Sequence, residues 1–257
     1  MEYVRYSIEE KTAFITLNRP LKRNALNALF VSELTAVFSN AEADAAVKVI
    51  VLNAEGEAFC AGADLEYLES LRTNSFEENL QDSKNLMVLF ERIYSSTKVT
   101  IACVEGHAIA GGCGLATVCD FVFTTPESLF GYTEVRIGFV PALVSVFLVR
   151  RIGEGRSREL LLTGDLVSAE AAQRIGLVTF IEPYGTIREK VFTFARNISK
   201  NTSGNAVLVT KKLISEVQKL DLHSGLEMAA VRNAEVRESD DFKKGLNAFL
   251  NKEKPSW

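Results

Sequence analysis

Three stretches of the sequence combine small residues, or an isolated carboxylate, in patterns that could support chemistry. The first, EAFCAGADL over residues 57–65, follows the apolar run Val47–Leu52 and sets small residues directly before Asp64. Such a turn can bring backbone N–H groups close to a ligand. On this stretch alone, a plain strand-to-helix turn with Asp64 as the N-cap is the favoured interpretation.

The second stretch, GHAIAGGCGLATVCD over residues 106–120, follows another apolar run, Val99–Val104. A helix that begins after glycines offers free N–H donors and the positive end of its dipole, and both stabilise a developing oxyanion. Glycines that serve only close helix packing explain the segment equally well. Two such loops after successive strands are more specific, because one N–H from each could bind a single carbonyl oxygen.

The third stretch, LFGYTEVRIGFVP over residues 129–141, places Glu134 among aromatic and aliphatic residues. Apolar surroundings disfavour the charged form of a carboxylate, which is one way to tune a general base. The alternative is a glutamate that points to solvent or pairs with Arg136, and without other information it is the more common outcome.

Strands that alternate with helices are expected to position these stretches. Short runs rich in β-branched or aromatic residues predict strands at Ala13–Leu17, Val47–Leu52, Val99–Val104, Phe121–Thr124 and Leu177–Ile181. Apolar residues at helical spacing predict helices at 27–40, 78–94, 144–151, 157–162 and 168–175. This alternation indicates an α/β core.

The C-terminal part of the chain has a different character. From about Thr186 the strand signal ends, and apolar periodicity predicts only helices, at 191–199, 206–217, 222–236 and 241–251. We therefore divide the chain into a core over 1–185 and a helical region over 186–257. Such a helical region can pack against a neighbouring chain or cover its own core.

Composition excludes several classes of protein. The 29 basic and 33 acidic residues give a net charge of −4 without a long basic run, so we expect no nucleic-acid partner. The four cysteines lie in apolar stretches without metal-ligand spacing, which predicts reduced thiols and no metal site. No segment approaches the roughly 18 apolar residues that span a bilayer. We expect a cytoplasmic protein that does not bind membranes.

Four motifs, in order and spacing, resemble those of the crotonase superfamily of enoyl-CoA hydratases and isomerases. They are NRP with NALN (residues 18–20 and 24–27), AFCAGADL, AGGCGLATVCD and FGYTEVRIGFVP, and the C-terminal ESDDFKKGLNAFLNKEKPSW is also similar. The resemblance covers essentially the whole chain. It implies an α/β spiral of repeated ββα units over 1–185, followed by helices that form a homotrimer or a dimer of trimers.

The resemblance also implies a site. The backbone N–H groups of Ala61 and Gly111 would form an oxyanion hole for the thioester of an acyl-CoA, with Glu134 as the acid/base. Coenzyme A, as part of the substrate, would be the only cofactor-like group. The implied CoA-binding residues, the last two from a neighbouring subunit, are Lys22, Arg23, Ala25, Gly62, Ala63, Asp64, Phe249 and Lys252.

The sequence departs from the family pattern at Gly114, where two-glutamate hydratases carry their first carboxylate. A single glutamate is typical of family isomerases, which shift a double bond from the 3 to the 2 position. The run TEVRIGFVPALVSVFLVRRIGE, together with Gly114, also resembles bacterial methylglutaconyl-CoA hydratases. Their substrate has a distal carboxylate, for which Arg72, Arg136 or Arg151 are the candidate cations. In a Gly114→Glu variant, we expect the new carboxylate to face Glu134.

Two rival classes are weaker. A serine hydrolase on a related fold would need a Ser-His-Asp triad, but the only histidines are His107 and His223, and no G-x-S-x-G motif occurs. A non-catalytic or RNA-binding role is disfavoured by the acidic balance of the chain. We expect an enoyl-CoA hydratase or isomerase, with hydration of 3-methylglutaconyl-CoA as the alternative.

Overall fold

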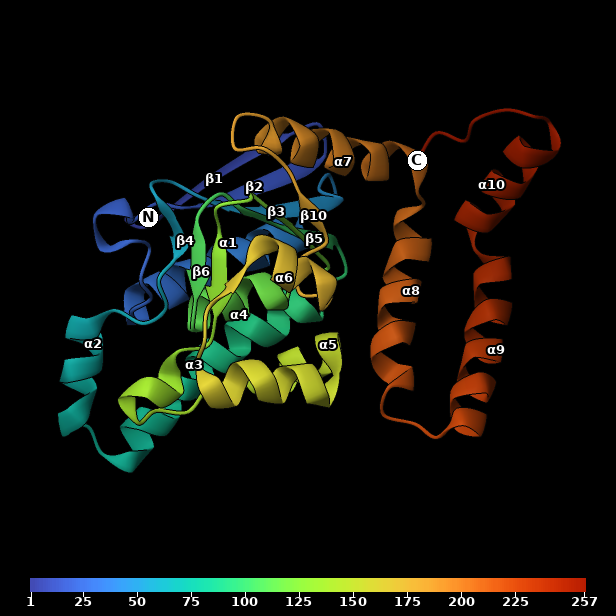
Figure 1. The fold of residues 1–257 in the computed structure, drawn as a ribbon. Coiled ribbons are helices and arrows are strands. Elements are labelled where there is room, and N and C mark those ends of the chain that lie inside the picture. Colours follow the sequence, from blue (N-terminus) through green and yellow to red (C-terminus); the bar gives the residue numbers. More distant parts are fainter.

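Two β-sheets form the body of the chain, which a computed structural model describes over all 257 residues (Figure 1). The large sheet has the strand order β1 (Val4–Glu9), β2 (Thr12–Leu17), β3 (Val49–Ala54), β5 (Val99–Val104), β7 (Phe121–Thr124), β10 (Phe180–Ile181). The small sheet has the order β4 (Ala58–Cys60), β6 (His107–Ile109), β8 (Leu129–Gly131), β9 (Val167–Ser168). Only the β1–β2 and β8–β9 pairs are antiparallel.

Each strand of the small sheet's parallel part directly follows a strand of the large sheet. The pairs β3–β4, β5–β6 and β7–β8 each lead into a helix, which confirms the expected repeat of ββα units. The helices are α1 (Ala28–Ala43), α2 (Leu65–Ser70), α3 (Phe76–Tyr94), α4 (Gly111–Thr117), α5 (Ala142–Thr163), α6 (Ala169–Arg174), α7 (Ile187–Asn201), α8 (Gly204–Val217), α9 (Leu222–Glu238) and α10 (Asp240–Leu250). Short 3₁₀ turns cover Pro20–Lys22, Leu71–Thr73 and Glu134–Ile137 (η1, η2 and η3).

The central strands are continuous apolar runs because both of their faces are buried. In β3, Val49 and Val51 pack toward α7, while Ile50 and Leu52 join the main core on the opposite face. In Figure 1, α7 covers one side of the large sheet, and α3, α4 and α5 lie on the other side. The two loops that follow β4 and β6 therefore emerge at the same edge of a packed scaffold.

The predicted elements agree with the structure where the apolar pattern is long. The strand predicted at Leu177–Ile181 is shorter, because the N–H groups of Leu177 and Val178 both donate to Ala172 O and extend the turn after α6. The helices predicted at 144–151 and 157–162 are parts of α5, interrupted only at Gly153, where φ is 78°. The three-residue strands of the small sheet and the edge strand β1 were not predicted.

Helices α9 and α10 stand apart from the sheets (Figure 1), whereas α8 contacts the body through Val207 and through Lys211, whose Nζ lies 2.6 Å from Asp120 Oδ2. None of the three helices contains a buried residue. Apolar side chains on them remain largely exposed, among them Leu222 at 80% and Phe249 at 79%. By contrast, α7 packs on the large sheet through Ile187, Val191 and Ala195. The first helix of the region 186–257 therefore belongs to the packed body, unlike α9 and α10. No helix is both long enough and apolar enough to cross a membrane.

A buried ion pair fixes the loop that enters α2. Arg19 Nη1 lies 2.5 Å from Asp64 Oδ2, and both side chains are almost fully buried. The same guanidinium donates to Ala25 O, and Asp64 caps α2 by accepting from the N–H groups of Glu66 and Tyr67. Burial raises the pKa of Asp64, but the hydrogen bonds from Arg19 and from the two N–H groups lower it further, so the net shift is downward.

The loop that enters α4 contains the least favourable backbone conformation of the site region. Ala110, the N-cap of α4, has φ 51° and ψ −125°, a combination that residues other than glycine rarely adopt. The conformation is held from outside, since the Ala110 N–H donates to Gly131 O at 2.7 Å. The backbone therefore stores strain at the residue that orients the first N–H of α4.

We predict that Asp64→Asn lowers the stability by about 3 kcal/mol at pH 7, because Arg19 is left buried without its counter-charge. The pKa of Asp64 is lower in the folded than in the unfolded state, so its contribution is complete above about pH 4 and is lost as the pH falls further. Urea denaturation at pH 7 and pH 3.5 should show the difference between the proteins shrinking in acid. The matched control is Asp165→Asn. Because Asp165 and its partner Arg136 are both exposed, we expect this change to lower the stability by less than about 1 kcal/mol. Equal losses for the two variants would contradict this assignment.

We predict that Ala110→Gly raises the stability by about 1 kcal/mol, since relief of the strained φ exceeds the entropic cost of glycine. The control is Ala36→Gly in the exposed middle of α1, where the same change should destabilise by about 1 kcal/mol. Thermal unfolding of the two variants measures both effects. A lower Tm for Ala110→Gly would show that the backbone is not strained there.

Candidate active site

The loops that follow β4 and β6 meet at two glycines. A Cβ at Gly62 would lie 2.9 Å from Ala110 Cβ, 3.1 Å from Ile109 O and 3.7 Å from Gly111 N, and the φ of Gly62 is 92°. Only glycine fits there. On its other side, the first loop pairs with the segment after η1 through Leu26 N to Gly62 O at 2.7 Å and Asp64 N to Leu26 O at 2.8 Å. The small residues in both motifs thus allow the two backbones to approach closely.

Two backbone N–H groups at this junction are free to donate. Gly111 is the first residue of α4, so its N–H has no partner within the helix. The N–H of Ala63 has no acceptor in the chain. The N–H of Ala61, however, donates to Arg23 O at 3.0 Å, which contradicts its predicted role as a donor to the ligand. The donors available for a carbonyl oxygen are therefore those of Ala63 and Gly111.

Glu134, at the start of η3, is half-buried, and its Oε2 is buried without a hydrogen-bond partner. The alternative pairing with Arg136 does not occur, because Arg136 pairs with Asp165. Burial raises the pKa of Glu134, although a hydrogen bond from its own N–H opposes the shift. The charge of Glu134 adds to the effect of burial in raising the pKa of Cys113, in α4, to about 11. An unpaired carboxylate with a raised pKa can both accept and return a proton.

Gly114 is buried, and a side chain at this position would meet α5 and α3. A Cβ there would lie 2.4 Å from Val144 Cγ1 and 3.0 Å from Phe90 Cζ. A glutamate at 114 therefore requires Val144 or Phe90 to move before it could face Glu134, so that expectation stays a prediction. Neither Val144 nor Phe90 was singled out from the sequence, because their apolar character fits any core position.

Most of the residues implied in CoA binding lie on the two paired segments beside the junction. Lys22 and Arg23 are exposed, and Lys22 Nζ lies 2.5 Å from Glu66 Oε1 at the start of α2. Ala25 is buried and holds Arg19 through its carbonyl oxygen, while the carboxylate of Asp64 is used internally. Gly62 and Ala63 can offer only backbone groups to a ligand. Phe249 belongs to α10 and Lys252 follows it, on the opposite side of the molecule from α2 (Figure 1).

The three arginines considered for a distal carboxylate all have partners. Arg151 donates to Thr117 O at 3.0 Å and to Cys119 O at 2.6 Å, so it closes the C-terminal end of α4. Arg136 pairs with Asp165, and Arg72 with Glu69 at 2.7 Å. None of the three is a free cation.

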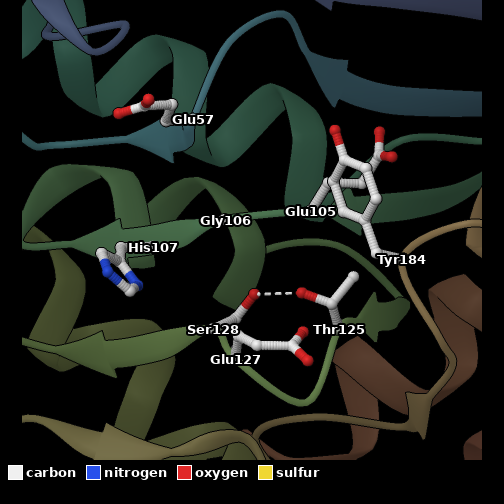
Figure 2. A pocket seen from close by; sticks show the side chains of 8 residues that line it. All are labelled: Glu57, Glu105, Gly106, His107, Thr125, Glu127, Ser128 and Tyr184. Carbon is white, nitrogen blue, oxygen red and sulfur yellow. Dashed lines mark hydrogen bonds between the residues drawn. The ribbon is translucent and has the colours of Figure 1, made fainter.

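A surface pocket at the far end of β5 and β6 holds His107 and does not form a triad (Figure 2). Ser128 Oγ lies 2.9 Å from Thr125 Oγ1, and His107 Nδ1 accepts from the backbone N–H of Leu129 at 3.1 Å. No hydrogen bond joins His107 to a serine hydroxyl, and the pocket is otherwise lined by carboxylates and Tyr184. The serine-hydrolase alternative thus lacks its catalytic arrangement. His223, the other histidine, is exposed in α9 beside Glu227.

The comparison with known proteins agrees with this architecture. The family model described as enoyl-CoA hydratase/isomerase matches residues 7–257. A Thermus thermophilus protein named "Putative enoyl-CoA hydratase" is 44% identical and covers 95% of this chain and 96% of its own. The mitochondrial enoyl-CoA hydratase of Pongo abelii is 31% identical, covering 98% and 87%.

Solved structures show the same fold. The enoyl-CoA hydratase of Bacillus anthracis is 30% identical, with a TM-score of 0.92 over 99% of this chain and 98% of that chain. An enoyl-CoA hydratase/isomerase of Marinobacter aquaeolei is 29% identical, with a TM-score of 0.93 over 100% and 99%. With a family model that spans nearly every residue and a crotonase fold, the chain belongs to the enoyl-CoA hydratase/isomerase family.

Proposed function

We propose that the chain binds the thioester oxygen of an enoyl-CoA between the N–H groups of Ala63 and Gly111 and moves protons with Glu134 as its single carboxylate. The observation that carries the proposal is the junction of the two loops, where two N–H donors have no partner, together with the half-buried Glu134, whose Oε2 has no hydrogen-bond partner. Donors held in place before the reaction stabilise the enolate oxygen more than the neutral carbonyl, and this difference lowers the barrier.

In a double-bond shift, the Glu134 carboxylate removes a proton from C2 of a 3-enoyl thioester. The electron pair of the C–H bond moves into the conjugated enolate, whose oxygen accepts hydrogen bonds from Ala63 and Gly111. The protonated Glu134 then returns the proton to C4, and the double bond lies between C2 and C3. One carboxylate suffices for this reaction, and the raised pKa of Glu134 makes its carboxylate a stronger base for the first step.

Hydration is the second candidate, and the names of the relatives favour it, since the Thermus thermophilus and Pongo abelii proteins are both named as hydratases. Here Glu134 would take a proton from water while the oxygen attacks C3 of a 2-enoyl thioester. The same proton, returned from Glu134 to C2, completes the addition. A branched substrate such as 3-methylglutaconyl-CoA would need a cation for its distal carboxylate, and the partners of Arg72, Arg136 and Arg151 argue against it.

The experiment that tests this function is a panel of 2-enoyl-, 3-enoyl- and 3-methylglutaconyl-CoA thioesters, with each product identified by mass. A gain of 18 Da identifies hydration, and an isomer of unchanged mass with a conjugated absorbance identifies the shift. Conversion of none of the thioesters would contradict the proposed function.

We further propose that the exposed apolar residues of α8–α10 pack against other copies of the chain, as homotrimers or dimers of trimers. Six of them are more than half exposed in a single chain: Ile214, Leu222, Leu226, Val231, Phe249 and Leu250. In such an assembly, Phe249 and Lys252 of one subunit would approach the nucleotide bound by Lys22 and Arg23 of another. Cytoplasmic location remains a prediction.

We predict that Glu134→Gln lowers turnover by about 10²-fold or more, with near-normal binding of the CoA ester, because the base is lost while its size is kept. The variant should also be more stable than the wild type at pH 7, since a buried unpartnered charge is removed. Because its pKa is raised, Glu134 binds a proton more tightly in the folded than in the unfolded state. The difference in stability between the wild type and Glu134→Gln should therefore narrow as the pH falls through the raised pKa. Unchanged turnover in the variant would return Glu134 to a structural role.

We predict that Leu226→Glu or removal of residues 221–257 prevents assembly of the native oligomer, because the apolar faces of α9 and α10 lose their partners. Sedimentation velocity measures the assembly. The control is Glu227→Gln, an exposed change on the same helix that removes no apolar contact. An intact wild-type assembly for Leu226→Glu and for the truncated chain would refute the assignment of this surface.

A further inference from the structure

We propose that Val144 is the residue that keeps this site in its one-carboxylate form, because its side chain occupies the space in which a side chain at position 114 would begin. The inference rests on the proposed function for its catalytic consequence, although its packing part does not. It identifies positions 114 and 144 as a coupled pair that decides whether a second carboxylate can stand beside Glu134.

The geometry at Gly114 singles out Val144. The three atoms nearest to a Cβ at 114 are Val144 Cγ1 at 2.4 Å, Phe90 Cζ at 3.0 Å and Phe90 Cε2 at 3.3 Å. Real Cβ atoms essentially never approach another atom to 2.4 Å, so the methyl group of Val144 is the first obstacle. Every other atom, including Val144 Cβ, lies no nearer than 3.3 Å, so alanine at 144 removes the severe contact.

Val144 cannot simply retreat. It lies in the first turn of α5, only 4% exposed, and belongs to the main core. Phe90 is fully buried and packs edge-on against Phe147 of α5, with ring centroids 6.2 Å apart. Because protein interiors are close-packed, neither side chain has empty space to move into. A substituent at 114 must therefore displace α3 or α5.

The position of Val144 in the chain links it to the catalytic carboxylate. Glu134 begins η3, and the same segment continues through Pro141 into α5, where Val144 follows. One segment therefore carries both the carboxylate and the apolar side chain that fills the space where a side chain at 114 would begin. With methyl groups at this place, a water molecule has fewer polar partners, and a water site needs two to four of them.

The packing part is tested by a double-mutant cycle of Gly114→Ala and Val144→Ala, read by thermal unfolding. Each single change should lower Tm by several degrees, the first by overlap with Val144 Cγ1 and the second by the cavity that it leaves. The double variant should lose clearly less than the sum, since each change relieves the other. Additive losses would overturn the proposal, and this readout does not depend on any activity.

The catalytic part is tested in the Val144→Ala background with Gly114→Glu and, as the matched control, Gly114→Gln. The glutamate variant should hydrate an unbranched 2-enoyl-CoA at least about 10-fold faster than both the glutamine variant and Val144→Ala, since a second carboxylate helps to hold and activate water. The acid limb of its pH–rate profile should move to higher pH, because two adjacent carboxylates raise one of the two apparent pKa values.

Gly114→Glu alone, with Val144 intact, should unfold at a lower temperature than Gly114→Glu with Val144→Ala and should gain no hydration. If Gly114→Glu alone is equally stable, or hydrates as fast as the double variant, Val144 does not control the site and the proposal fails. Equal rates for the glutamate and glutamine variants would overturn it as well. Failure of the proposed function is distinguishable, because it would appear with Gly114 and Val144 unchanged, as equal turnover of the wild-type protein and Glu134→Gln.

Discussion

The close approach of two backbone loops at Gly62 and Ala110 is the constraint on which the rest of the site depends. No side chain fits at residue 62, and the backbone of Ala110 is bent into a strained conformation so that the first N–H of α4 lies beside the loop after β4. The ββα repeat makes this contact possible, since each unit delivers its loop to the same edge. Donors fixed in this way need no reorganisation when charge develops on a bound oxygen.

The buried carboxylate of Asp64 and the half-buried carboxylate of Glu134 have opposite environments. Asp64 is neutralised by Arg19 and by the N-terminus of α2, so its pKa is lowered and it serves the loop that carries Ala63. Glu134 has no counter-charge, so burial raises its pKa and leaves it available to exchange protons. The environment, and not the residue type, thus separates a structural acid from a reactive one.

The sequence contained enough to predict the α/β repeat, the two glycine-containing loops and Glu134, because long apolar runs and four motifs in register are strong signals. It led us to predict Ala61 as the donor in place of Ala63, since both are small residues of one turn and only the hydrogen bond from Ala61 N–H to Arg23 O distinguishes them. The Arg19–Asp64 pair and the contact of Val144 with Gly114 join segments far apart in the chain, so no local pattern indicated them. The packing of α7 on the large sheet also joins distant segments, so the sequence did not separate α7 from the other helices of 186–257.

The central claim, that one carboxylate forms an enolate held by two backbone donors, is tested most directly by proton exchange at C2 of a saturated acyl-CoA in D₂O. Such a thioester cannot be hydrated or isomerised, so exchange reports enolate formation alone. We predict that the wild-type protein catalyses deuterium incorporation at C2, detected by mass, and that Glu134→Gln does not. Exchange at the wild-type rate in Glu134→Gln, or none in the wild type, would contradict the account.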